Sequence, residues 1–285
     1  MNREIVRFEE AQYKYKSHDG IENRPAVSDI NVKVEQGQFV VVIGRNGSGK
    51  STFARLTNAL ILPTGGAVYI NGINTAEDEQ IWDIRQLVGM VFQNPDNQLV
   101  ATSVEEDVAF GPENLGIKSD EIELRVEEAL KAVGMLDQKK SAPHNLSGGQ
   151  KQKIAIAGIL AMKPKCIILD ESTSMLDPIG RKEVLTVIKK LNVEEKITVI
   201  HITHQMNEAV FGDRVIVIDG GKIVKDGTPA EVFSNVEEIK RLGLDVPQVT
   251  ELLYELKNEG VDLPLDIIDV DKAIEVIKKL YEVTA

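Results

Sequence analysis

The chain has 285 residues, of which 42% are hydrophobic and 27% charged, so it can bury a core, and disordered or collagen-like classes are excluded. Its 33 basic and 45 acidic residues give a net charge of −12, which argues against nucleic acid as a partner because phosphate backbones bind basic patches. The single cysteine, Cys166, excludes a disulfide within the chain.

The first part of the chain is predicted to form strands followed by a loop and a helix. Two segments alternate between apolar and polar residues, and a third is apolar throughout, which is typical of a strand buried on both faces. These segments are 5–8, 30–34 and 39–43. A helical pattern then runs from Ser51 to about Leu62, where Pro63 and a Gly65-Gly66 turn are expected to end it.

Between the third strand and this helix lies GRNGSGKS, residues 44–51, which fits the phosphate-loop pattern GxxxxGK[ST] at every fixed position. Its glycines let the backbone approach phosphate oxygens, and successive N–H groups form an anion site at the helix N-terminus. Lys50 adds a full positive charge toward the terminal phosphates, and the Ser51 hydroxyl is a predicted Mg²⁺ ligand. We therefore predict a nucleotide-binding loop.

Further along, helices alternate with short apolar strands. Helices are predicted at 121–133, 151–162 and 181–191, and strands at 166–169, 197–200 and 215–218. This alternation predicts a largely parallel sheet with both faces covered.

After about residue 232 the pattern changes to that of a small helical appendage. It contains two amphipathic helices, at 249–259 and 271–283. Either Asp269 or Asp271 is a suitable N-cap for the second helix, because each carboxylate can accept a first-turn N–H.

Asp170 and Glu171 directly follow a predicted strand. Ligands of open α/β sheets bind beyond the carboxyl ends of the strands, so Asp170 is expected to face the phosphate loop and complete a Mg²⁺ shell. Glu171 is then placed to polarise an attacking water. Gln93 and His204 each follow another apolar segment and are candidates for contact with the metal or water and with the γ-phosphate, although a lone histidine is more often a packing or surface residue.

The sequence LSGGQ at 146–150 places a Ser N-cap and two glycines before an apolar helix, which makes a second anion-binding helix N-terminus. One nucleotide does not need both helix N-termini, that of the phosphate loop and that of LSGGQ, from the same chain. A head-to-tail pair of chains is therefore expected, each lending this loop to the nucleotide of the other. This arrangement, and the order of the motifs along residues 5–232, resemble those of ABC-type ATPases.

The resemblance implies an α/β fold, with a P-loop NTPase core of the ABC type that carries an antiparallel β subdomain and a helical subdomain. The ATP-binding domain would span 1–232, with its helical subdomain at about 94–163. The appendage, 233–285, would then serve dimerisation.

The same resemblance implies a catalytic centre that uses ATP and Mg²⁺. Glu171, His204 and Gln93 would be the catalytic residues. Ser51, Asp170 and Gln93 would contact the metal ion.

It also implies which residues hold the nucleotide. Tyr15, preferred over Tyr13, would stack on adenine, and Asp177 would communicate across the dimer. Besides Ser51, the phosphate-loop contacts would be Gly44, Arg45, Asn46, Gly47, Ser48, Gly49, Lys50 and Thr52. The signature that binds the ATP of the partner chain would comprise Ser147, Gly148, Gly149 and Gln150.

Three segments narrow the resemblance within the family. Residues 91–98 and 104–112 are similar to ATPases of energy-coupling factor importers, and 170–178 to the first of their two ATPase paralogues. The implied function is ATP hydrolysis that powers vitamin or transition-metal uptake through ATP-driven dimerisation. The implied partners are a second cassette, identical or paralogous, a transmembrane coupling subunit and a separate substrate-binding membrane subunit.

The chain itself is expected to lack a membrane anchor. No apolar stretch reaches the ~20 residues of a spanning helix, and the amino end shows no signal peptide. We expect a peripheral position on the cytoplasmic face of the cell membrane. Asp96 and the acidic run 105–107 are candidate contacts with basic residues of the membrane subunit, or solvated charges only.

Three other functions are alternatives to this one. The first is that of a soluble ABC ATPase acting on nucleic acid or ribosomes. The single cassette and the absence of sustained heptads between the phosphate loop and the signature argue against it. An ATPase of another ABC importer class is a closer alternative. A non-hydrolysing regulatory cassette is a third, and Glu171 argues against it.

Overall fold

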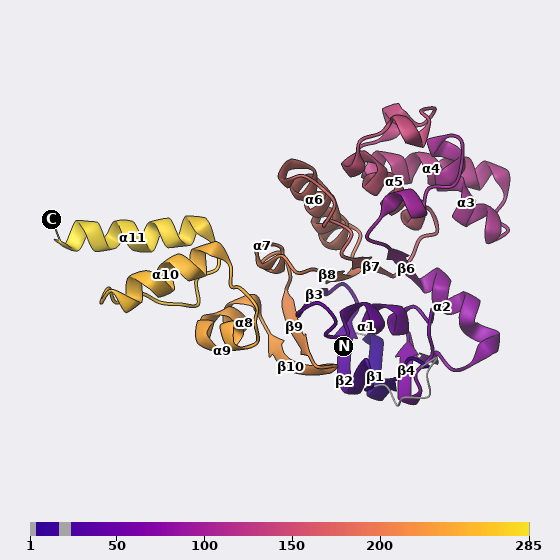
Figure 1. Ribbon diagram of the computed structural model, residues 1–285. Helices are drawn as coiled ribbons and strands as arrows, with labels where there is room; N and C mark the ends of the chain where they lie inside the picture. The colour runs from indigo at the N-terminus through magenta and orange to yellow at the C-terminus, as the bar shows by residue number, and fades with distance from the viewer. Residues whose placement is uncertain (1–3, 17–23, 285) are drawn as a thin grey trace.

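The computed structural model describes residues 4–16 and 24–284, and a mainly parallel sheet lies at its centre (Figure 1). Its strand order is β10-β9-β3-β8-β7-β6. The strands are Phe39–Ile43 (β3), Val88–Val91 (β6), Cys166–Asp170 (β7), Thr198–Ile202 (β8), Arg214–Asp219 (β9) and Lys222–Gly227 (β10). Within the described residues only the edge strand β10 pairs antiparallel in this sheet, which confirms the predicted parallel arrangement.

A second, antiparallel sheet has the order β2-β1-β4-β5 and confirms the antiparallel subdomain. It is formed by Glu4–Tyr13 (β1), Val27–Glu35 (β2), Gly65–Ile70 (β4) and Ile73–Asn74 (β5). The predicted Gly65-Gly66 turn is wrong, because both residues belong to β4. Gly66 has φ +68° where the register between β1 and β4 shifts, and a Cβ there would lie 2.2 Å from the Glu10 carbonyl oxygen. The glycine therefore serves a β-bulge.

Helix α1, Lys50–Thr57, packs between the two sheets and ends before the predicted Leu62. Ala59 adopts a left-handed conformation, φ +53°, and the Leu60 N–H donates to the Arg55 carbonyl oxygen at 2.9 Å. This left-handed C-terminus stops the helix ahead of Pro63. Phe53 of α1 stacks on Phe8 of β1 with 4.7 Å between ring centroids.

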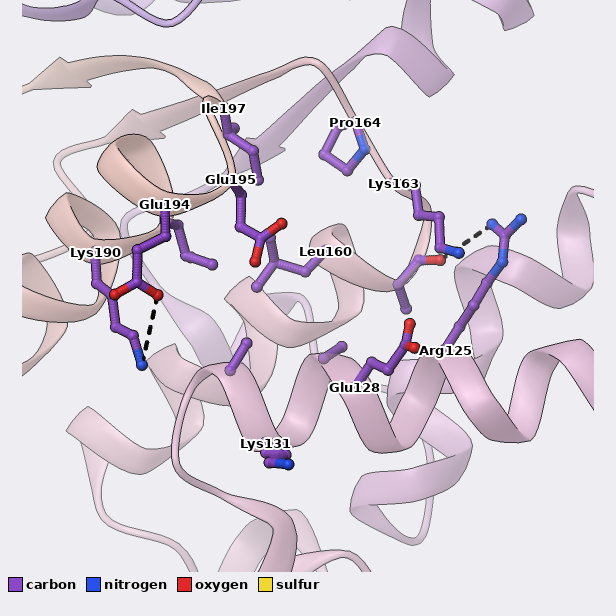
Figure 2. Close-up of a pocket in the computed structure, with 14 residues that line it drawn as sticks. Arg125, Glu128, Lys131, Leu160, Lys163, Pro164, Lys190, Glu194, Glu195 and Ile197 are labelled. Carbon is purple, nitrogen blue, oxygen red and sulfur yellow. Dashed lines mark hydrogen bonds and ion pairs between the residues drawn. The ribbon is translucent and has the colours of Figure 1, made fainter.

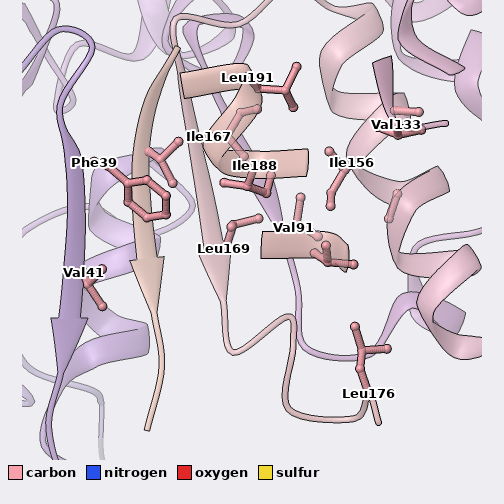
Figure 3. Packing of buried hydrophobic residues seen from close by; sticks show 14 of the residues in the cluster. Phe39, Val41, Val91, Val133, Ile156, Ile167, Leu169, Leu176, Ile188 and Leu191 are labelled. Atoms are coloured by element: carbon pink, nitrogen blue, oxygen red, sulfur yellow. The ribbon is translucent and has the colours of Figure 1, made fainter. Parts of the chain in front are cut away.

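The central sheet is buried on both faces, as the unbroken apolar run of β3 predicts. Phe39, Val41 and Ile43 lie in a core cluster shared with the helices on one face, part of which is shown in Figure 3. Val40 and Val42 lie in a second cluster with α1 and the antiparallel sheet. Cys166, on β7, belongs to the second cluster and is fully buried.

Helices α3, α4 and α5 pack on one another as a helical group (Figure 1). The helices of the cassette are Ile81–Leu87 (α2), Val104–Asn114 (α3), Ser119–Ala132 (α4), Gly148–Ala161 (α5), Pro178–Glu194 (α6) and Met206–Ala209 (α7). Short 3₁₀ turns lie at Asp78–Gln80, Pro95–Asn97, Leu136–Gln138 and Pro143–Asn145.

A cavity of about 720 Å³ separates α4 from the end of α6 (Figure 2). Its wall includes Pro164 and Ile197, which precede β7 and β8, so it lies at the amino ends of these strands. Charged side chains of both signs surround it, and Lys190 lies 3.8 Å from Glu194. The cavity therefore lies at the opposite end of the parallel strands from the phosphate loop, which follows the carboxyl end of β3.

The C-terminal part consists of Pro229–Ser234 (α8), Val236–Arg241 (α9), Gln248–Asn258 (α10) and Val270–Thr284 (α11). Helix α8 crosses the predicted boundary at 232, and Phe233 and Ile239 belong to the main core cluster. A separate small cluster begins only in the α10–α11 hairpin. Of the two N-cap candidates, Asp269 caps α11, since its Oδ1 accepts the Lys272 N–H at 2.9 Å.

Every helix in the described ranges is too short or too polar to span a bilayer.

Candidate functional site

Four segments with candidate residues follow the carboxyl ends of neighbouring parallel strands. The phosphate loop follows β3, Gln93 follows β6, Glu171 follows β7 and His204 follows β8. The parallel register brings these ends to one edge of the sheet. The candidates predicted from separate motifs are thus assembled in one place.

The phosphate loop joins β3 directly to α1, whose first residue is Lys50. Gly49 has φ +111°, and a Cβ there would lie 2.4 Å from the Ala26 carbonyl oxygen. Both the conformation and the close approach require glycine at this position. The loop N–H groups therefore lie at the positive end of α1, as an anion site needs.

Lys50 curls back over the loop and is only 4% exposed. Its Nζ donates to the carbonyl oxygens of Gly44 at 2.9 Å and Arg45 at 3.1 Å. Burial lowers the pKa of Lys50, while the carboxylates of Glu171 and Asp170 act in the opposite direction. The loop thus holds a buried ammonium group, whose ion pair with Glu171 Oε1 is long, at 3.9 Å.

Ser51 and Asp170 lie together, as predicted for a shared metal ion. The Ser51 hydroxyl donates to Asp170 Oδ1 at 3.1 Å. Burial raises the pKa of Asp170, and the bond from Ser51 opposes this shift. In residues 4–16 and 24–284 no three His, Cys, Asp or Glu side chains form a metal cluster. A hydroxyl and one carboxylate fit Mg²⁺ that takes its other ligands from phosphates and water.

Glu171 is held in a strained conformation at the end of β7. It has φ +51°, which is uncommon for a residue other than glycine, and its N–H donates to the Ile202 carbonyl oxygen at 3.0 Å. Its Oε2 lies 3.7 Å from His204 Nδ1. Such strain is typical of functional positions, and here it turns the carboxylate toward Lys50 and His204.

Gln93 lies beside this group, but its amide is not directed at Ser51 or Asp170. Its Nε2 donates to Ser174 Oγ at 3.1 Å, and Ser174 Oγ donates to the Glu171 carbonyl oxygen at 2.7 Å. The contact of Gln93 with a metal ion stays a prediction that requires a change of its side-chain conformation.

Two cavities flank Glu171. One, of about 450 Å³, is lined by Tyr15 and by the phosphate loop from Asn46 to Thr52. Tyr15 Oη lies 3.2 Å from Thr52 Oγ1, whereas Tyr13 packs edge-on against Tyr15 outside this cavity. This arrangement favours Tyr15 as the adenine contact.

The second cavity, of about 520 Å³, includes residues that the sequence did not indicate. Besides Gln93 and His204 it is lined by 243–245, in the loop between α9 and α10. The side chain of Arg45 packs against Gly243, where an added Cβ would lie 3.0 Å from it. No motif marks this loop, and its contact with the phosphate loop depends on the packing of α8 and α9.

The signature forms the N-terminus of α5. The Gln150 N–H donates to Ser147 Oγ at 3.3 Å, and the Ser147 N–H donates to Gln150 Oε1 at 2.9 Å, so the predicted cap is a full capping box. Ser147 and Gly148 are exposed, and no signature residue lines either cavity beside Glu171. Asp177 caps α6 by accepting the Gly180 N–H at 2.8 Å.

The sequence is similar to known ATP-binding subunits over almost its whole length. Residues 27–174 match the protein family described as ABC transporter. Energy-coupling factor transporter ATP-binding protein EcfA1 of Caldanaerobacter subterraneus subsp. tengcongensis is 59% identical, over 96% of this chain and 98% of its own length. EcfA1 of Clostridium novyi is 57% identical, over 98% of this chain and 100% of its own length.

Solved structures agree with this similarity. The structure of cbiO1 from Clostridium perfringens, described as part of the ABC transporter complex cbiONQ, has a TM-score of 0.75 and 36% identity, and covers 88% of this chain and 99% of that one. The dimeric bacterial ABC transporter cassette MJ0796 has a TM-score of 0.70 and 32% identity, and the match covers 78% of this chain and 98% of that one. The chain belongs to the ABC transporter family, and within it to the ATP-binding subunits of energy-coupling factor transporters.

Proposed function

We propose that this ATPase subunit powers vitamin or transition-metal uptake by closing, with a second cassette, around two ATP molecules. The observation that carries the proposal is that Lys50, Asp170, Glu171 and His204 meet at one sheet edge, while the signature turn around Ser147 faces solvent. One chain therefore holds two half-sites that need a partner.

Each residue at the sheet edge has a role in this reaction. The loop N–H groups and Lys50 bind the phosphates, and Ser51 with Asp170 would hold Mg²⁺, which neutralises phosphate charge when bound. Glu171 orients and polarises the attacking water, and His204, 3.7 Å from it, contacts the γ-phosphate. Loss of the γ-phosphate then weakens the link between the cassettes.

Ser147→Arg is expected to leave ATP binding intact and to abolish hydrolysis. Ser147 lines neither cavity beside Glu171, so its own chain binds ATP without it, but an arginine would block the nucleotide of the partner. ATP affinity by titration and phosphate release check the two effects. Hydrolysis by Ser147→Arg at the unsubstituted rate would contradict sites shared between chains.

Mixing this variant with Lys50→Ala sharpens the test for a pair of identical chains. Each variant alone is inactive, but a mixed pair has one site with an intact phosphate loop and an intact signature. Partial recovery of activity on mixing is the expected result. In a pair with a paralogue, either variant alone leaves one site with an intact phosphate loop and an intact signature, so a partial loss of activity is the expected result there.

The acidic residues expected to contact the membrane subunit are bonded within the chain. Lys151 lies 2.7 Å from Asp96, and Glu105 pairs with neighbouring lysines. Glu106 caps α3, and Asp107 accepts two backbone N–H bonds, at 2.7 and 3.0 Å. These bonds occupy the acidic side chains within the chain, so we propose a surface for the membrane subunit that binds mainly through apolar contacts.

That surface is an apolar groove of about 330 Å³ beside the segment that carries Gln93. Trp82 of α2 and Phe110 of α3 line it and are 72% and 54% exposed. Its floor includes Gln98, whose Oε1 accepts the Phe92 N–H at 2.9 Å. A helix of the coupling subunit seated there would contact the chain next to Gln93, and it would hold the ATPase on the cytoplasmic face of the membrane.

Phe110→Ser is expected to weaken co-purification with the membrane subunits by roughly tenfold, because an exposed aromatic anchor is lost. ATP binding by the isolated chain should not change. Val193→Ser on α6 is the matched control, since Val193 is 52% exposed and does not line the groove. Equal recovery of the membrane subunits with both variants would remove the groove from this role.

A further inference from the structure

A buried carboxylate, Glu208, lies behind the site and does not line either cavity beside Glu171. It belongs to the short helix α7 and is 2% exposed. Thr173 Oγ1 lies 2.9 and 3.0 Å from its two oxygens, and His201 Nε2 lies 2.8 Å from Oε2. Thr173 and His201 are themselves 1% and 0% exposed.

The chemistry of these contacts fixes the donors. An ionised carboxylate only accepts hydrogen bonds, so the Thr173 hydroxyl and the His201 Nε2–H both donate to Glu208. Burial alone would raise the pKa of Glu208, but the bonds and charge that its neighbours supply hold that pKa below its usual range. Arg181 Nε adds a cation 3.4 Å from Oε1.

These partners join the two loops that carry Glu171 and His204. Thr173 stands two residues after Glu171 in the loop between β7 and α6, and Glu208 stands four residues after His204, which lies in the loop between β8 and α7. Arg181 donates from its guanidinium to the Leu176 carbonyl oxygen at 3.3 Å, near the end of the β7–α6 loop and directly before Asp177. Glu208 thus links the segment after His204 to both parts of the β7–α6 loop.

A buried ion pair adds little net stability, because the free-energy cost of desolvating its charges offsets their attraction, and well-packed apolar residues would stabilise the fold at least as much. It does fix geometry, since its bonds are directional and its loss leaves uncompensated charges. We propose that Glu208 is a positioning residue, which holds the loop of Glu171 and Asp177 and the loop of His204 in the arrangement needed for hydrolysis. The inference rests on the proposed function, since it concerns the rate of that reaction.

Glu208→Gln tests this with little change of shape, in the chain paired with its second cassette. We expect kcat to fall about tenfold while the Kd for ATP stays within about twofold, because the phosphate loop does not touch Glu208. Thr173→Val, which removes the donor from another loop, should also lower kcat. The kcat of the double variant should be no lower than that of the slower of the two single variants, as expected for residues of one network.

Glu194→Gln is the control, because it removes an exposed carboxylate paired with Lys190 at 3.8 Å. If Glu208 had a purely structural role, Glu208→Gln would lower the melting temperature and leave kcat unchanged, and this result would overturn the proposal. Additive effects on kcat in the double variant would also overturn it. If Glu208→Gln does not fold, an unchanged kcat in Thr173→Val overturns it. Absence of hydrolysis by the unsubstituted pair would instead overturn the proposed function.

Discussion

Lys50→Ala is expected to abolish ATP binding at micromolar nucleotide. Lys50 is the only lysine of the phosphate loop, and its ammonium lies among carbonyl oxygens and carboxylates, where the triphosphate would place its negative charge. A hydrogen bond to a charged group is worth about 3 kcal/mol at the upper end, so the loss of one such bond raises Kd by up to roughly a hundredfold. Titration with a fluorescent ATP analogue measures it.

Lys153→Ala is the matched control for this variant. Lys153 is also largely covered, at 15% exposure, and its Nζ lies 2.7 Å from Glu183 Oε2 in an ion pair between α5 and α6. The variant should lose this ion pair and keep the ATP affinity of the unsubstituted protein. Unchanged ATP affinity in Lys50→Ala would refute the assignment of the loop.

Glu171→Gln is expected to bind ATP normally and to hydrolyse it about 10²–10⁴ times more slowly, the range for loss of a positioned general base. Glutamine keeps the shape of the side chain, so the strained backbone and the bond to the Ile202 carbonyl oxygen should persist. Because hydrolysis would separate the cassettes in the proposed cycle, the variant should also accumulate as an ATP-bound pair.

Phosphate release and light scattering test the two effects of this variant together. Glu183→Gln, which alters a 55% exposed carboxylate on α6, should match the unsubstituted protein in both. Turnover at the normal rate in Glu171→Gln would remove Glu171 from the role of base, even if binding and pairing behaved as described.

The elements that sequence alone predicted are those with a strong periodic or positional signal. The apolar run 39–43 and the loop after it predicted β3 and the N-terminus of α1, and the acidic pair marked the end of β7. These signals are local, because buried strands need apolar residues and phosphate loops need glycine and lysine at fixed spacing.

The elements that sequence missed depend on contacts between distant residues. The bulge at Gly66 lies where the register between β1 and β4 shifts, between Glu9 and Gln12. The end of α1 is an exception, because the left-handed Ala59 sets it locally without a residue type that marks that conformation. The bond of Gln93 to Ser174 depends on a side-chain conformation that no motif encodes. The packing of α8 and α9 on the main core likewise has no local signal.

The burial of Cys166 makes the protein suitable for site-directed labelling. It is the only thiol, it is 0% exposed, and burial raises its pKa, so thiol reagents should not modify it in the folded state. A cysteine introduced on the exposed signature turn would then be the sole reactive position without removal of the native residue. Spin labels attached there would report the approach of two cassettes directly, as a distance that shortens when ATP is added.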